Sequence, residues 1–65
     1  MEFTTNMREY RRRKKMSQAE LAERVGCRRE TIGKLENGKY NPSLKLALDV
    51  DRELDASVYD LFFFD

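Results

Sequence analysis

Residues that begin or end helices recur at short intervals through the middle of this chain. Gly26, Asn37-Gly38 and Asn41-Pro42 separate segments of about eight to fourteen residues that lack the strand-like alternation of apolar and polar side chains. Short connections between segments of this length favour a compact helical bundle. With 65 residues in total, the chain is predicted to form one domain, over residues 1–65, around one small core.

The pattern predicts five helices, over about residues 6–15, 17–25, 28–36, 43–54 and 57–61. Ser17 with Glu20, and Ser57 with Asp60, have the spacing of capping boxes, in which each side chain binds a free amide of the other residue. Pro42 suits the first turn of the fourth helix, and Ser43 suits its cap.

Both ends of the chain have β-type composition, around Phe3-Thr4 and Phe62-Phe63-Phe64, which predicts a small two-stranded ribbon between them. Three consecutive phenylalanines cannot all be buried inside so small a chain, so part of the segment 57–65 should face a partner. The predicted dimer interface consists of Phe3, Phe62, Phe63 and Phe64.

The chain has no histidine and one cysteine, Cys27. Zinc sites built from Cys and His, an internal disulfide and a histidine general base are therefore excluded, and we expect no enzyme activity, no cofactor and no metal. Cys27 is either a small packing residue or a redox sensor whose thiol pKa Arg28 would lower. No apolar run approaches the ~20 residues of a membrane span or begins the chain as a signal peptide, so we expect a cytoplasmic protein.

The net charge of +1 hides an asymmetry between the two parts of the chain. Residues 1–40 hold eleven basic and six acidic residues, a net charge of +5, whereas residues 41–65 have a net charge of −4. This division predicts one face for a polyanion and another face for a different contact.

The most informative segment is SQAELAERVGCRRETIGKLENG, residues 17–38. Two helices of about eight residues joined by a tight turn form a helix-turn-helix, here over about 17–36, whose second helix enters the DNA major groove. At its tip, Arg28 and Arg29 can donate to guanine O6 and N7. Glu30 can accept from cytosine N4 or instead hold Arg29, and the Thr31 methyl can contact thymine.

The chain resembles the lambda-repressor-like Cro/CI (XRE-type) helix-turn-helix family, in particular its short single-domain regulators. The resemblance rests on SQAELAERVG, Thr31-Ile32, LENGKYNPSL and SVYDLF, which occur in this order and cover about residues 7–62. It implies an all-α bundle of five helices that binds double-stranded DNA, and members of this length commonly dimerise through their C-terminal region.

The resemblance also assigns residues by position. The base-reading positions are Arg28, Arg29, Glu30, Thr31, Gly33 and Lys34. The positions that contact backbone phosphates are Ser17, Gln18, Asn37, Gly38, Lys39 and Tyr40. In relatives, residues corresponding to Arg11 and Glu36 form a buried salt bridge between the first and third helices.

The chain departs from the family pattern at four positions. Arg28 replaces a capping Ser or Thr, and Lys15 and Asp55 replace turn glycines, at a cost of about 1 kcal/mol each. Asp51 replaces a small buried Ala, so it pairs with a cation such as Arg11 or Lys14, or its helix is slightly rotated.

These features together predict a sequence-specific, homodimeric transcriptional repressor that reads a palindromic operator and lies on the nucleoid when DNA-bound. The alternative hypothesis is an antitoxin-type module, in which the acidic, Phe-rich end binds a partner protein.

Overall fold

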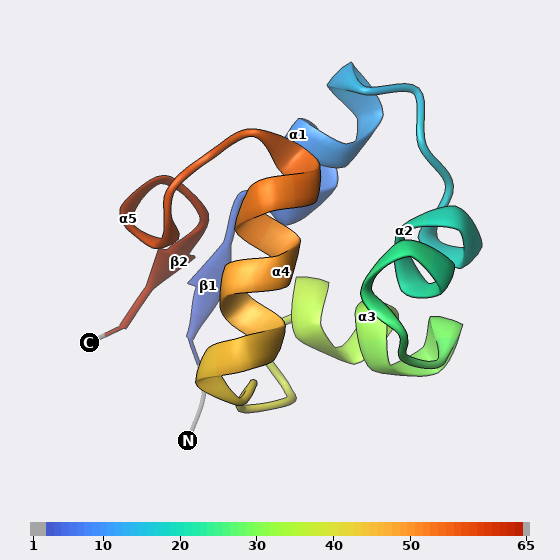
Figure 1. The fold of residues 1–65 in the computed structure, drawn as a ribbon. Helices are drawn as coiled ribbons and strands as arrows, with labels where there is room; N and C mark the ends of the chain where they lie inside the picture. The colour runs from blue at the N-terminus through green and yellow to red at the C-terminus, as the bar shows by residue number, and fades with distance from the viewer. Residues whose placement is uncertain (1–2, 65) are drawn as a thin grey trace.

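The computed structural model describes residues 3–64 and contains five helices packed beside a two-stranded sheet (Figure 1). In chain order the elements are β1 (Thr4–Thr5), α1 (Met7–Arg13), α2 (Gln18–Val25), α3 (Arg29–Glu36), α4 (Leu44–Leu54), α5 (Val58–Leu61) and β2 (Phe62–Phe63). The predicted five-helix architecture and the predicted terminal ribbon are both confirmed.

Helix α4 occupies the middle of the bundle. It packs against α2 on one side and α5 on the other, and it also contacts α1 (Figure 1). Every helix contributes to the core, which consists of Phe3, Met7, Met16, Leu21, Ala22, Ile32, Leu35, Ala47, Val50, Leu54, Leu61 and Phe62. Within residues 3–64, no helix is both long enough and apolar enough to cross a bilayer.

Three serines start helices by accepting hydrogen bonds from free backbone amides. Ser17 Oγ accepts from the Glu20 amide at 3.0 Å, and Ser43 Oγ accepts from the Leu46 amide at 3.1 Å. Ser57 forms a complete capping box with Asp60. At Ser17 only the serine half of the predicted box is present, and the Glu20 carboxylate accepts a hydrogen bond from Arg24 at 3.1 Å.

Four of the residues in the described range 3–64 have left-handed backbone conformations in turns. Lys15 and Asp55 have φ of 57° and 56°, so both strained turns predicted at replaced glycines are present. Gly26 ends α2 with φ of 77°. Gly38 has φ of 71°, and a Cβ at this position would lie 1.7 Å from the carbonyl oxygen of Phe3, so only glycine fits here.

The β-ribbon joins the two ends of the chain antiparallel, with Thr4 opposite Phe63 and Thr5 opposite Phe62. Phe3 and Phe62 are only 6% and 7% exposed, and their ring centroids are 6.0 Å apart. These two rings therefore belong to the core of this chain, which corrects the expectation that they face a partner. Phe63 and Phe64 are exposed.

Asp51 on α4 has an incompletely satisfied carboxylate. Its Oδ1 atom is buried without a hydrogen-bond partner, although the Val58 amide donates to the carboxylate. Burial raises the pKa of Asp51, the Val58 amide opposes this effect, and the nearby charge of Asp60 adds to it. Neither cation proposed for Asp51 reaches it, because Arg11 pairs with Glu36 and Lys14 lies 3.9 Å from Asp55.

Candidate nucleic-acid interface

Helices α2 and α3 form the helix-turn-helix, and α3 begins with its leading residues in solvent. Arg28 is the N-cap residue, in an extended conformation and without a side-chain cap, so the predicted loss of the usual cap is present. Arg28, Arg29, Glu30 and Lys34 are exposed, whereas Thr31 and Gly33 are half-buried. The tip of α3 is therefore free to meet a ligand.

Arg29 is tied to α2 rather than to its own neighbour. Its Nη1 donates to Gln18 Oε1 at 3.2 Å. Across residues 3–64, Arg29 and Glu30 form no ion pair with each other, so the alternative role of Glu30 as a holder of Arg29 is not seen. The carboxylate of Glu30 is thus left available at the surface.

Gln18 is the first residue of α2, and its side chain reaches α3. Its Nε2 donates to Glu36 Oε1 at 3.0 Å while its Oε1 accepts from Arg29. Gly33 faces this amide: a Cβ at Gly33 would lie 3.8 Å from both Oε1 and Nε2 of Gln18. Both polar atoms of the amide are therefore already bound within the protein.

The residues expected at phosphates lie at two places around α3. Ser17 and Gln18 start α2, where Ser17 is exposed. Asn37, Lys39 and Tyr40 are exposed in the segment after α3, and Gly38 is buried because it packs against Phe3.

Arg11 and Glu36 form a buried ion pair that connects α1 to the end of α3. Arg11 Nε donates to Glu36 Oε2 at 2.6 Å, with the two side chains 10% and 0% exposed. Arg11 Nη1 also donates to the Met16 carbonyl at 2.8 Å. Arg11 therefore connects three parts of the fold: its own helix α1, the end of α3 and the turn that precedes α2.

Glu36 remains charged although it is buried. Burial raises its pKa, but hydrogen bonds from Arg11 and Gln18, the charge of Arg11 and a hydrogen bond from Arg8 outweigh burial and leave the pKa of Glu36 below its ordinary 4.5. The interface thus has a buried carboxylate at its base that is ionised at neutral pH.

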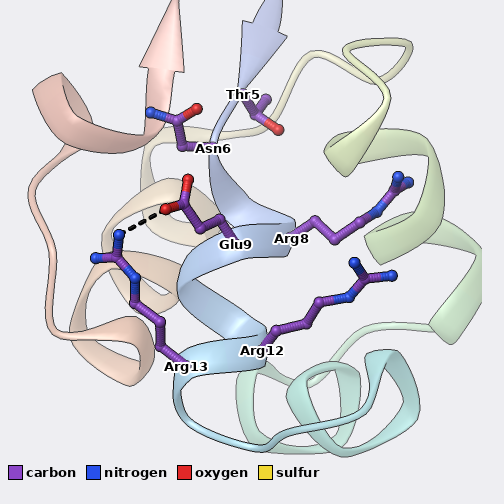
Figure 2. Close-up of a pocket in the computed structure, with 6 residues that line it drawn as sticks. All are labelled: Thr5, Asn6, Arg8, Glu9, Arg12 and Arg13. Atoms are coloured by element: carbon purple, nitrogen blue, oxygen red, sulfur yellow. Dashed lines mark hydrogen bonds and ion pairs between the residues drawn. The ribbon is translucent and has the colours of Figure 1, made fainter.

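Two arginines of α1, Arg8 and Arg12, extend the basic surface beyond the residues predicted from the sequence. Figure 2 shows both side chains leaving α1 in the same direction, toward α3, while Glu9 and Arg13 pair with each other on another side of the helix. Arg8 donates to Glu36 at 3.4 Å and to Asn37 Oδ1 at 3.2 Å. The signal in the sequence is their spacing of four residues, which places both on one helix face.

Cys27 does not have the environment of a reactive thiol. Its side chain is half-buried, and burial raises its thiol pKa, contrary to the expected lowering by Arg28. Its Sγ instead lies 3.5 Å from the Arg28 carbonyl oxygen. Among residues 3–64, no group of three or more Asp, Glu or Cys side chains is placed to hold a metal ion.

Comparisons with known proteins agree with this geometry. A helix-turn-helix family model matches residues 7–61. An uncharacterized HTH-type transcriptional regulator of Archaeoglobus fulgidus is 56% identical over 61 residues, covering 94% of this chain and 86% of the relative.

Two solved structures share the fold. The restriction-modification controller protein C.AhdI from Aeromonas hydrophila is 35% identical with a TM-score of 0.74, covering 83% of this chain and 82% of its own. The clp gene regulator ClgR from Corynebacterium glutamicum is 33% identical with a TM-score of 0.75; the match covers 83% of this chain and 57% of ClgR. The descriptions of these relatives, an HTH-type transcriptional regulator, a controller protein and a gene regulator, agree with the expectation that the chain is not an enzyme. The chain belongs to the Cro/CI-like (XRE-type) helix-turn-helix family of DNA-binding transcriptional regulators.

Proposed function

We propose that this protein binds one DNA sequence in preference to others and represses transcription by covering a promoter. The observation that carries the proposal is the exposed leading turn of α3, where Arg28, Arg29 and Glu30 are free of core packing. A helix presented in this way enters the major groove with its N-terminal residues against the base edges.

The surface divides into base-reading and backbone-binding parts. The forked donors of Arg28 and Arg29 suit guanine, and the Glu30 carboxylate suits the amino group of cytosine. Arg12 is exposed and lies parallel to Arg8 on α1, where guanidinium groups would bind phosphate oxygens (Figure 2). Asn37 and Lys39 would bind the backbone at the other end of α3.

We further propose that the protein is a homodimer. An apolar groove lies between the start of α4, α5 and β2, lined by Asn41, Pro42, Ser43, Leu44, Ala47, Val58, Tyr59, Phe62 and Phe64. Leu44 is 74% and Tyr59 is 85% exposed, which is unfavourable for large side chains unless a partner covers them. Among residues 3–64, no charged residue lines the groove, so these side chains of a second copy can meet it across a twofold axis without repulsion between like charges.

The position of the groove leaves the helix-turn-helix uncovered. In Figure 1, α5 and β2 lie on the opposite side of α4 from α2 and α3. A twofold dimer formed there would present two α3 helices to a palindromic operator whose half-sites lie ~34 Å apart, one turn of DNA. Such a protein would be found on the nucleoid while bound.

Selection of bound sequences from random duplexes tests the DNA-binding proposal. We expect a palindromic consensus, and we expect its gel shift to weaken steeply as salt rises, because phosphate contacts release counterions. Failure to enrich any sequence, or binding that is indifferent to salt, contradicts the proposal.

Two arginine variants separate base reading from backbone binding. Arg29→Ala should remove the preference at one base pair of the consensus, whereas Arg12→Ala should weaken binding to all duplexes alike and reduce the salt dependence. Equal effects of the two substitutions on preference would contradict the division.

The mass in solution tests the dimer. Light scattering at tens of micromolar should give twice the chain mass for wild type and one chain mass for Tyr59→Glu, which places a charge in the groove. Arg52→Glu, at an exposed position of α4 outside the groove lining, is the matched control and should remain dimeric. A wild-type monomer contradicts the homodimer, and a co-purifying second protein in its place supports the antitoxin-type module.

A further inference from the structure

The first strand of the ribbon contacts both surfaces that the proposed function uses. On one side, β1 pairs with β2, and Phe62 and Phe64 at this end of the chain line the apolar groove (Figure 1). On the other side, β1 packs against α3, close to the loop 37–39 that would bind the DNA backbone. Residues 3–6, which contain β1 and its two flanking residues, are called the strap below.

Ring contacts and a backbone hydrogen bond attach the strap to the side of the groove. The ring centroid of Phe3 lies 4.8 Å from that of Phe64 and 6.0 Å from that of Phe62. The Asn6 amide donates to the Leu61 carbonyl at 2.9 Å. Phe3 is buried, and it therefore supports two of the rings that line the groove.

Two other contacts attach the strap to the end of α3. Thr5 Oγ1 donates to the Glu36 carbonyl at 2.8 Å. The Phe3 carbonyl lies so close to Gly38 that a Cβ at Gly38 would be 1.7 Å from the carbonyl oxygen. Because the loop 37–39 follows Glu36 directly, displacement of the strap would remove contacts that hold this loop.

The strap is short enough to open as one unit. A ribbon with two residues in each strand is marginal by itself, so the docking of the strap depends on the contacts on its two sides. The docked and undocked strap are then two states of the molecule, and a ligand that binds the docked state better increases its population. A second copy in the groove and DNA at the loop would both act in this way.

We propose that Phe3 and Thr5 are positioning residues that couple the groove to the loop 37–39, so that dimerisation and DNA binding strengthen each other within one subunit. The inference rests on the proposed function, in which a second copy fills the groove and the loop binds DNA. This coupling is separate from the gain in affinity that a dimer obtains by binding two half-sites at once.

A duplex with a single half-site tests the inference, because only one subunit of a dimer binds it at a time. Dissociation constants are measured for wild type and for the monomeric variant Tyr59→Glu, over the concentration range in which wild type is dimeric. A dimer has two reading surfaces, which gives it a statistical advantage of about twofold. We expect wild type to bind about fivefold more tightly than Tyr59→Glu beyond this factor.

Thr5→Val keeps nearly the shape of the side chain and removes its hydrogen bond to the Glu36 carbonyl. When Tyr59→Glu is compared with its parent in this background, the fivefold difference should disappear and only the statistical factor should remain. Thr4→Val is the matched control and should keep the fivefold difference, because Thr4 is exposed and its side chain takes part in none of these hydrogen bonds within residues 3–64.

A difference that persists in Thr5→Val would come from the charge that Tyr59→Glu adds, and it overturns the inference. The absence of a difference in the wild-type background overturns it as well. Wild type that binds no duplex, or that is a monomer, refutes the proposed function itself.

Hydrogen exchange at the Asn6 amide measures the strap without a substitution in it, and so decides the question even if Thr5→Val does not fold. This amide exchanges when its bond to the Leu61 carbonyl opens. It should exchange faster in Tyr59→Glu than in wild type, and the half-site duplex should slow its exchange in Tyr59→Glu by about fivefold. Exchange that responds to neither change overturns the inference and leaves the proposed function intact.

Discussion

Two carboxylates have buried oxygen atoms, Glu36 at the end of α3 and Asp51 on α4. Their pKa values are shifted in opposite directions. Burial raises the pKa of both, but the donors around Glu36 reverse the effect and lower its pKa, whereas Asp51 keeps a raised pKa. Glu36 binds three side-chain donors, and Asp51 has one backbone donor and an unpartnered Oδ1.

At Glu36 the three side-chain donors, two of them arginines, outweigh the effect of burial on the pKa, whereas at Asp51 the one backbone amide does not. The two carboxylates also lie in different parts of the molecule, one basic and one acidic. Glu36 lies beneath the basic surface. Asp51 lies toward α5, in the acidic part of the chain and away from the helix-turn-helix.

The largest effect is expected from breaking the Glu36 pair. Arg11→Met should lower the free energy of unfolding by about 3–5 kcal/mol, because it removes the principal partner of a buried carboxylate. Urea denaturation followed by circular dichroism measures this loss. Arg13→Met removes the exposed pair with Glu9 and should cost no more than about 0.5 kcal/mol. Similar losses in both variants would show that the buried pair contributes no more to the free energy of unfolding than the exposed pair does.

Gly33→Ala should change stability and DNA binding in opposite directions. Alanine in the middle of a helix is favoured over glycine by about 1 kcal/mol, and the nearest atoms are at ordinary van der Waals distance, so the variant should be more stable. Its binding to the selected duplex should weaken because, in the proposed mode of binding, the new methyl group would stand on the side of α3 that faces DNA. Thermal denaturation measures the expected gain in stability, and gel shift on the same preparation measures the expected loss of binding. Unchanged binding would show that Gly33 does not belong to the base-reading surface.

Asp51→Asn should stabilise the protein by about 0.5–1 kcal/mol at neutral pH. The amide oxygen can still accept from the Val58 amide, while the buried charge and its repulsion by Asp60 are gone. Urea denaturation at pH 7 measures the gain, and a loss of stability would mean that the ionised carboxylate is satisfied in solution.

The pH dependence of stability should show opposite contributions from these two groups. The folded-state pKa of Glu36 lies below 4.5, so its contribution is complete above pH 4.5 and is lost as pH falls through the folded pKa. The folded-state pKa of Asp51 lies above 3.8, so its contribution favours folding below pH 3.8 and is lost as pH rises through the folded pKa.

Unfolding free energies of wild type and Asp51→Asn from pH 3 to pH 7 test this sign. The advantage of the variant should grow with pH from near pH 3.8 upward. An advantage that shrinks over the same interval would reverse the assignment for Asp51.

The local signals in the sequence were sufficient for the helices. Ser17, Ser43 and Ser57 cap them, and Lys15 and Asp55 adopt the strained turns expected where glycine is missing. Each of these features depends on a few neighbouring residues, which is why sequence alone identified them. Two signals were exceptions: Pro42 precedes the Ser43 cap and lies outside the first turn of α4, and Glu20 does not complete the capping box at Ser17.

The contacts between distant segments were not predictable in the same way. Phe3 and Phe62 were expected to face a partner, but pairing of the two ends of the chain buries both rings. The triplet of phenylalanines does not reveal which ring points inward, because that depends on the register of the ribbon. Likewise, the link from Glu36 to Arg29 requires the Gln18 side chain to reach α3 from α2, and no spacing in the sequence shows this.

The face that meets DNA is tested most directly by backbone amide chemical shifts of the 15N-labelled protein during titration with the selected duplex. The largest changes should occur in residues 28–34 of α3 and its cap, at Gln18 and along the Arg8–Arg12 face of α1, with little change in α5. Changes centred on α5 and the start of α4, with the tip of α3 unaffected, would contradict the proposed mode of binding.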